Sequence, residues 1–205
     1  LAASVSSSAF ASSSTEIRST GSIIPSSCNP TLGSTSIELG KISVGELDAT
    51  NNTQLPTKTV SLTVQCLAPT QFALRAIDNN PSSALLGSDQ AFGLGLDTNS
   101  EKIGYFGLRF QGATLTGDQS TVIGLVSTDK VNWGLAPLSG PEGGTGPAIS
   151  HGSNYLGFAS QGNLTVQALT QLQGQLEIST IIAPASSLDT TNDVTINGSA
   201  TIEVI

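Results

Sequence analysis

The residues best suited to chemistry are few. The 205-residue chain has one histidine, His151, and two cysteines, Cys28 and Cys66. A histidine can act as a base for a serine or cysteine nucleophile when a carboxylate orients it. Serines are so frequent around "ISHGSN" that their nearness in sequence is uninformative, and we interpret His151 as a solvent-facing or hydrogen-bonded loop residue. The sequence therefore predicts no catalytic site and no enzyme.

Three further motifs have non-chemical interpretations. The segments "LDTNSE" (96–101) and "LDTTND" (188–193) carry oxygen ligands that could hold calcium weakly, but neither has the spacing of an EF-hand loop. Aspartate and asparagine in this context also form turns, which is the interpretation we favour. The glycine-rich "GPEGGTG" (140–146) lacks the Lys-Ser/Thr of a phosphate-binding loop. We expect no metal site and no cofactor-binding site.

The two cysteines are better explained as a pair. Cys28 and Cys66 close the strand-like runs "GSIIPSSC" and "TVSLTVQC" and do not form a C-x-x-C motif. This spacing argues against a zinc or redox motif and favours a disulfide formed in an oxidising compartment. Two separate buried thiols are the alternative, and they would make stability indifferent to reductant.

The beginning of the sequence suggests export. "LAASVSSSAFA" is typical of the end of a secretory signal peptide, with Ala9-Phe10-Ala11 as the A-x-A cleavage site and Ser12 as the first mature residue. A cut after Ala3 is a second option, and a disordered serine-rich terminus is the alternative to a signal peptide.

Composition excludes several classes of function. Charged residues make up only 11% of the chain, and 15 acidic against 7 basic residues give a net charge of −8. Binding to phosphate backbones needs clustered Lys and Arg, so we expect no nucleic acid partner. The longest apolar runs fall well short of the roughly 18 residues that suggest a membrane-spanning helix, so we expect no membrane span.

Period-two hydrophobicity recurs along the chain and predicts short strands punctuated by Gly, Pro, Asn and Asp. Helical signal is sparse: "SSALLGSDQAFGL" (82–94) could hold a short helical turn. Residues 135–154 are rich in Gly and Pro and predict a long surface loop. We therefore expect one all-β domain. The predicted strands are "TVSLTVQC" (59–66), "QFALRAID" (71–78), "YFGLRFQG" (105–112), "TVIGLVST" (121–128), "LTVQALTQL" (164–172), "GQLEISTII" (174–182) and "VTINGSATIEVI" (194–205).

Three of these motifs, in this order, resemble the subunits of bacterial chaperone–usher fimbriae, of the beta-fimbria type. They are "TEIRSTGSIIPSSC" (15–28), "TVSLTVQC" and the closing "INGSATIEVI" (196–205). The likeness covers both ends of the chain, while the middle matches only as generic strands. It implies an all-β fold, an incomplete immunoglobulin-like β-sandwich that a donor strand completes. The implied division is a signal-peptide remnant (1–11), an N-terminal extension that acts as donor strand (12–22) and the pilin β-sandwich domain (23–205).

The resemblance also implies partners and site residues. A periplasmic pilus chaperone would first fill the open groove, and at the outer-membrane usher the extension of a neighbouring pilin subunit would replace it. The implied role is that of a structural subunit of a cell-surface fimbrium that supports adhesion and biofilm formation. The donor positions would be Ser13, Thr15, Ile17 and Ser19, and the groove-lining C-terminal strand would carry Val194, Ile196, Ala200, Ile202 and Val204.

The alternative function is a tip or minor subunit that binds a host or glycan receptor. Trp133 and Tyr155 flank the loop at 135–154 and could stack on a sugar ring. Aromatic residues in such positions more often pack against the sandwich, which is the competing interpretation.

Overall fold

The computed structural model describes Arg18 and residues 27–140 and 143–205. Within these residues the regular structure consists of β-strands and three single-turn 3₁₀ helices, so the chain is all-β as predicted. The elements are β1 (Cys28–Leu32), η1 (Val44–Glu46), β2 (Thr53–Gln54), β3 (Lys58–Thr70), β4 (Ala73–Asp78), β5 (Phe92–Gly93), β6 (Gly104–Phe110), η2 (Gly112–Thr114), β7 (Thr116–Gly117), β8 (Ser120–Ser127), β9 (Gly134–Leu135), β10 (Tyr155–Ser160), β11 (Leu169–Ile182), η3 (Ala185–Ser187) and β12 (Ala200–Val204).

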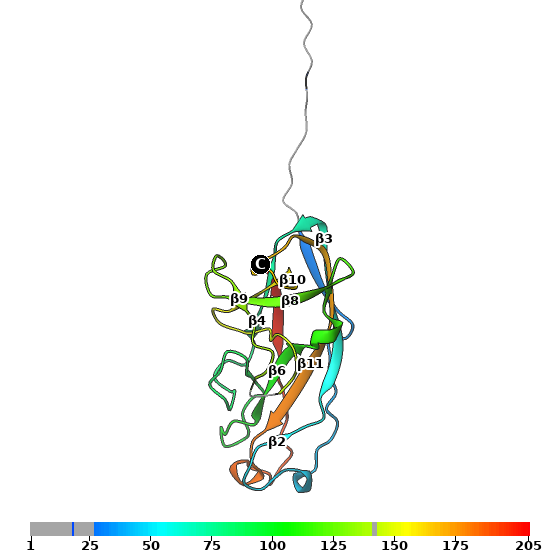
Figure 1. Cartoon of the computed structure of the whole chain (residues 1–205). Helices are drawn as coiled ribbons and strands as arrows, with labels where there is room; N and C mark the ends of the chain where they lie inside the picture. The colour runs from blue at the N-terminus through cyan, green and yellow to red at the C-terminus, as the bar shows by residue number, and fades with distance from the viewer. Residues whose placement is uncertain (1–17, 19–26, 141–142) are drawn as a thin grey trace, which may run out of the picture.

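The strands form one continuous antiparallel path that wraps around the core (Figure 1). Its order is β1-β3-β11-β7-β8-β10-β4-β12; β2 and β6 also pair with β11, β5 pairs with β6, and β9 pairs with β8. β1 and β12 are the two ends of this path. They lie beside one another, with Cα atoms within 8 Å, but share no ladder of hydrogen bonds. The sheet is therefore nearly barrel-shaped, with a seam between its first and last strands.

The core follows from the alternation that the sequence predicts. On β3, Val60, Leu62 and Val64 are buried, whereas between them Ser61 is exposed and Thr63 is half-buried. β11 pairs with β3 along most of its length and buries its own alternate residues against the same core. On the facing side, β4, β8 and β10 contribute a second set of buried side chains, among which Phe158 contacts both Phe72 and Phe110. The predicted strands at 59–66, 71–78, 105–112 and 121–128 are confirmed.

The structure corrects three predicted elements. The expected strands at 164–172 and 174–182 are one long strand, β11, that begins only at Leu169 and has a register shift between Leu169 and Gln171. β10 was not predicted, because its alternate small residues give little period-two signal. Residues 82–94 hold no helix; they contain β5 and one isolated bridge, from Ala84 to Gly104, and several of them pack over the outer face of β6.

The expected strand at 194–205 exists only from Ala200 to Val204. Its partner, β4, ends at Asp78, so the ladder has no further residues to pair with beyond the Asn79 N–H to Ser199 O bond of 3.1 Å. The chain before it instead follows the core surface: a Cβ atom at Gly198 would lie 2.8 Å from Leu94 Cδ2 and 2.9 Å from Phe106 Cε1.

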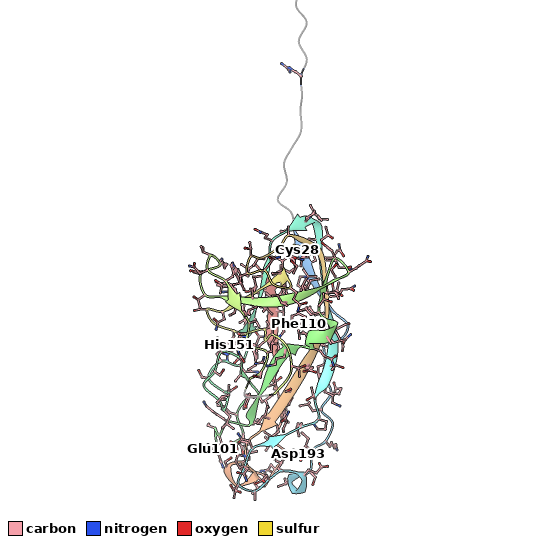
Figure 2. The ribbon with its side chains drawn as sticks, in the orientation of Figure 1. Cys28, Glu101, Phe110, His151 and Asp193 are labelled. Atoms are coloured by element: carbon pink, nitrogen blue, oxygen red, sulfur yellow. A yellow bond between two sulfur atoms is a disulfide. The ribbon has the colours of Figure 1, made fainter. Side chains whose placement is uncertain are left out.

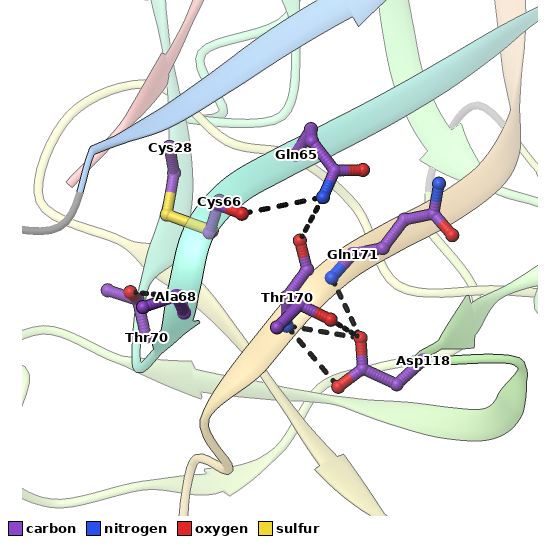
Figure 3. Close-up of a disulfide and its surroundings, with 8 residues drawn as sticks. All are labelled: Cys28, Gln65, Cys66, Ala68, Thr70, Asp118, Thr170 and Gln171. Carbon is purple, nitrogen blue, oxygen red and sulfur yellow. Dashed lines mark hydrogen bonds between the residues drawn. A yellow bond between two sulfur atoms is a disulfide. The ribbon is translucent and has the colours of Figure 1, made fainter.

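The predicted disulfide is present. Cys28 and Cys66 are directly opposite each other in the β1–β3 ladder, and their sulfur atoms are bonded (Figure 3). The bond attaches the five-residue edge strand β1 to the thirteen-residue strand β3. The alternative of two separate thiols is excluded for this structure, and the disulfide becomes a main attachment of the edge strand.

Reducing this disulfide should destabilise the protein. The bond closes a loop with a sequence separation of 38 residues, for which the chain-entropy model gives about 4 kcal/mol. We expect the urea midpoint to fall when dithiothreitol is added, as followed by circular dichroism. The control is the double variant Cys28→Ala/Cys66→Ala. Its urea midpoint should already be lower and should not change when dithiothreitol is added. Equal midpoints for the wild type with and without reductant would contradict this role.

Candidate functional site: the open seam between β1 and β12

The seam begins with the free edge of β12. Ile205 and Ala73 exchange both main-chain hydrogen bonds, at 2.9 and 3.1 Å, so odd-numbered residues of this strand direct their N–H and C=O groups to β4. By the alternation of an antiparallel pair, Ala200, Ile202 and Val204 direct theirs to the opposite side. Among the described residues no strand pairs with that side. β12 therefore presents unpaired donors and acceptors along its outer edge.

The same strand divides its side chains between two faces. The Arg75 Nε donates to Glu203 Oε2 at 2.7 Å on the outer face, where both side chains are about one-third exposed. The pKa of Arg75 is raised by this hydrogen bond and by the charge of Glu203. On the inner face, Ile202 and Val204 are half-buried and pack against the core. β12 is thus attached to β4 while its apolar face borders the seam.

The free edge of β1 forms the other side of the seam. Gly33 N donates to Ser61 O at 2.9 Å and Leu67 N donates to Ser27 O at 3.1 Å, so odd-numbered residues pair with β3. The groups of Cys28 and Leu32 therefore face away from β3, together with Pro30, which has no N–H to donate. A strand that paired with β1 would find few donors there and would depend mainly on β12.

The side chains beneath the seam are incompletely covered. Apart from Val126, every half-buried apolar residue that packs against the main core comes from residues 28–55 or 188–204. These residues are Cys28, Leu32, Ile37, Leu47, Leu55, Leu188, Val194, Ile196, Ala200, Ile202 and Val204. The half-covered part of the core is therefore contributed by the first and last segments of the described chain, which include the two strands that border the seam. The seam is the candidate functional site.

The predicted groove residues are distributed over two kinds of structure. Ala200, Ile202 and Val204 lie on β12, whereas Val194 and Ile196 lie in the irregular segment before it. All five pack against the main core and are half-buried. The predicted donor residues Ser13, Thr15, Ile17 and Ser19 lie outside the described residues. Their role, and that of the groove, remains a prediction.

The aromatic pair proposed for ligand stacking lies around Lys130. The Trp133 Nε1 donates to the Lys130 carbonyl at 3.2 Å, and the Lys130 ammonium lies 5.0 Å from the centre of the Tyr155 ring. The ring of Trp133 also packs against Gly157 and Val166. Both aromatic rings thus have protein contacts, and ligand binding by this pair stays a prediction.

The largest fully buried side chain is one that the sequence analysis did not single out. Arg109 is 1% exposed, and its guanidinium donates to the carbonyls of Pro137 and Gly146 and, at 2.6 Å, to Gln90 Oε1. A Cβ atom at Gly144, where φ is +95°, would lie 2.6 Å from Arg109 Cδ. The loop at 135–154 is therefore only partly a surface loop: Gly146, Pro147, Ile149 and Ser150 are buried. This correction arises because a buried cation needs acceptors, and loop carbonyls provide them.

The acidic segments meet at the end of the molecule opposite Cys28, where Figure 2 labels Glu101 and Asp193. Asp97 accepts hydrogen bonds from the N–H groups of Asn99 and Glu101, at 2.9 and 2.8 Å, and from that of Asp189 at 2.8 Å. The Thr98 hydroxyl donates to Asp189 Oδ2 at 2.9 Å. Both segments are turns, as favoured above, and their aspartates connect them to each other.

These hydrogen bonds lower two pKa values. The pKa of Asp97 is lowered chiefly by the N–H of Asp189, and that of Asp189 chiefly by the Thr191 hydroxyl.

Within the described residues no group of three or more His, Cys, Asp or Glu side chains is arranged to hold a metal ion. His151 packs edge-on against Phe92, and its Nε2 lies 3.2 Å from the Ala91 carbonyl oxygen. In the part of the chain that is described, no helix is long and apolar enough to cross a membrane.

Acid should loosen this end of the molecule. Because the folded-state pKa values of Asp97 and Asp189 lie below the ordinary aspartate value of 3.8, their contribution to stability is present above that pH and is lost as the pH falls through the lowered values. We expect urea midpoints to fall between pH 5 and pH 3, and Asp97→Asn to lower the midpoint at pH 7 and weaken its pH dependence.

Asp193→Asn is the matched control for this measurement. The Asp193 side chain accepts no hydrogen bond from the described residues, although it lies at the same end of the molecule. It should leave both the midpoint at pH 7 and the acid response nearly unchanged. If Asp97→Asn behaves like Asp193→Asn, the hydrogen bonds of Asp97 do not stabilise the fold.

Two comparisons place the chain among known sequences. A family model described as "Protein of unknown function (DUF1120)" matches residues 17–91, a stretch that contains both cysteines. The chain is also similar to "Protein GltF" of Escherichia coli (strain K12), with 26% identity over an alignment 229 positions long that covers 94% of this chain and 88% of that protein. The likeness to that protein therefore extends over most of both chains.

Proposed function

We propose that this protein is a non-enzymatic structural subunit of a chaperone–usher fimbrium and that the seam between β1 and β12 accepts a donor strand. The observation that carries the proposal is that β1 and β12 lie side by side, each with an unpaired edge, over half-covered apolar side chains. An extended peptide that adds to such an edge supplies main-chain hydrogen bonds and places alternate side chains in the groove. The subunit would be exported through the periplasm to the cell surface.

The strand order supports the immunoglobulin-like part of the proposal. An immunoglobulin constant-type sandwich has strands A, B, E and D in one sheet and C, F and G in the other. Here β1, β3, β11 and β6 are neighbours in the order A-B-E-D, and β4 pairs with β12 as C pairs with F. β8 and β10 extend the second sheet beyond β4. The place of strand G, beside the free edge of β12, is where the donor would bind.

The geometry of the seam indicates that a donor must open it. Some Cα atoms of β1 and β12 lie within 8 Å, whereas a strand hydrogen-bonded between them needs about 9.6 Å, or two strand spacings. Opening exposes the apolar floor, and the donor must cover that floor again. In the proposal the periplasmic chaperone supplies the first occupant, and the extension of a neighbouring subunit replaces it at the usher.

The predicted donor strand would gain only a modest free energy on binding. Ile17 is the single large apolar residue among the predicted donor positions, and its burial contributes roughly 1.5–3 kcal/mol. Each main-chain hydrogen bond adds about 1 kcal/mol net. Because Pro30 cannot donate, most of these bonds would form with Ala200, Ile202 and Val204. The proposal thus requires that most of the binding free energy of the donor come from its pairing with β12.

A peptide that copies residues 12–21 (SSSTEIRSTG) should stabilise the protein. At a peptide concentration of ten times Kd, linkage gives about 1.4 kcal/mol, or roughly 4 °C in Tm for a chain of this size. Thermal unfolding followed by circular dichroism against peptide concentration measures this shift. The control peptide carries Ile17→Ser, which keeps the main chain and removes the apolar side chain, and it should bind more weakly.

A pair of protein variants tests whether the peptide binds at the seam. Ile202 faces the groove, and its neighbour Thr201 faces the outer surface, where its hydroxyl lies 3.2 Å from Asn79 Nδ2. We expect Ile202→Asn to abolish the peptide-induced shift and Thr201→Asn to retain it. A Tm that responds neither to the peptide nor to a periplasmic pilus chaperone would refute the assembly proposal.

A further inference from the structure

One face of the molecule carries a regular array of uncharged polar side chains. The register of the ladders aligns Thr31 of β1, Thr63 of β3, Gln173 of β11, Thr116 of β7 and Thr121 of β8 in a single row. Side chains of paired residues point to the same face of a sheet. Five strands with four spacings of about 4.8 Å make this row about 19 Å wide.

A second row lies parallel to the first. Asn29 is opposite Gln65, and Gln65 is opposite Gln171. Figure 3 shows Gln65 and Gln171 on adjacent strands, and the Gln65 Nε2 donates to the Thr170 carbonyl at 3.0 Å. Residues two positions apart on one strand are about 6.8 Å apart. We call these two rows, which lie on the outer surface of β1, β3, β11, β7 and β8, the neutral face.

The neutral face has unused hydrogen-bonding capacity. Asn29, Thr31, Gln65, Thr121 and Gln173 are exposed, and the remaining members are half-exposed. Among the described residues, the hydroxyls and amides of the first row have no hydrogen-bond partner. Each glutamine amide offers two donors and an acceptor, and each threonine offers a hydroxyl beside a methyl group.

The two rows of the neutral face contain no ionisable side chain. In register, Glu177 of β11 lies on the same face, four residues beyond Gln173 and opposite Thr59 of β3. The Asp118 carboxylate is directed to the N–H groups of Thr170 and Gln171, at 3.1 and 2.8 Å, and borders the face (Figure 3). The face therefore offers no cation to an anionic polymer and no large apolar area to a membrane.

A protein partner also fits poorly. Protein interfaces obtain most of their affinity from buried aromatic, Met or Arg anchors. Neither row contains one, and each hydrogen bond exchanged with water contributes only about a factor of five in affinity. Weak contacts of this kind become effective when one ligand repeats the same group many times, because each further contact is then intramolecular.

We propose that the neutral face is a binding surface for uncharged polysaccharides. Their hydroxyl groups match the glutamine amides and threonine hydroxyls as donors and acceptors, and their C–H faces match the threonine methyl groups. The repeat of the polymer allows contacts across several strands at once. The seam is not involved, so this inference does not depend on the proposed assembly.

Affinity electrophoresis of the full chain tests the proposal. Native gels are cast without polymer, with dextran, hydroxyethylcellulose or soluble starch, and with alginate as an anionic polymer. We expect slower migration in at least one neutral gel relative to the polymer-free gel, and no retardation by alginate. Absence of retardation in all three neutral gels would overturn the proposal.

Two isosteric variants localise the binding. Gln173→Glu places a charge at the centre of the face without changing its shape, and Gln161→Glu makes the same change in the exposed loop between β10 and β11. Both have the same net charge, so they should migrate alike in the polymer-free gel. We expect Gln173→Glu to weaken binding by about fivefold or more and Gln161→Glu to bind as the wild type does. Thr63→Ala, which removes one hydroxyl from the same row, should weaken binding to a smaller extent.

Two outcomes would contradict the assignment to this face. Equal loss in Gln173→Glu and Gln161→Glu would mean that the added charge, and not its position, reduces binding. Sedimentation equilibrium that shows a dimer in the wild type and a monomer in Gln173→Glu, without retardation by any polymer, would assign the face to a second copy of the chain.

Discussion

The structure depends on the need of sheet main-chain groups for partners. From β1 around to β12 each strand hydrogen-bonds with its neighbours in an antiparallel ladder, and the wrapped sheet brings its two ends together. At that point the pairing stops: Ala200, Ile202 and Val204 on one side and Cys28 and Leu32 on the other direct their N–H and C=O groups into the seam. A sheet that wraps this far without closing leaves an edge that attracts another strand.

Each strand at the seam is anchored on the side away from it. The disulfide between Cys28 and Cys66 attaches β1 to β3, and the ion pair between Arg75 and Glu203 joins β12 to β4. Both attachments stabilise the border of the seam without filling it. The apolar side chains below stay half-buried for the same reason, since no strand lies above them. The proposed donor strand would satisfy the main-chain groups and cover these side chains together.

Few charged side chains lie beside the seam or the neutral face: Arg75 and Glu203 pair with each other on the outer side of β4 and β12, and Asp118 borders the neutral face. The aspartates of the turns at 96–101 and 188–193 gather at the end opposite the disulfide, where main-chain N–H groups and hydroxyls solvate them. Arg109 is buried under the loop at 135–154, where carbonyl oxygens accept hydrogen bonds from its guanidinium. The seam and the neutral face are left for uncharged contacts. The first presents main-chain groups over apolar side chains, and the second presents amides and hydroxyls.

The sequence by itself determined the all-β class, the cysteine pair and the buried positions of the regular strands. Alternation at Val60, Leu62 and Val64 could be interpreted locally, because the side-chain period of a strand is two whatever its partner is. The pairing partners could not be found in this way, since register depends on residues more than a hundred positions apart, as for Gln173 and Thr63. Only the tertiary structure showed that β12 begins at Ala200, where β4 ceases to offer partners, and that Arg109 is buried under a loop of glycines and prolines. It also decided that the first and last strands meet without pairing, because that depends on how far the whole sheet curls.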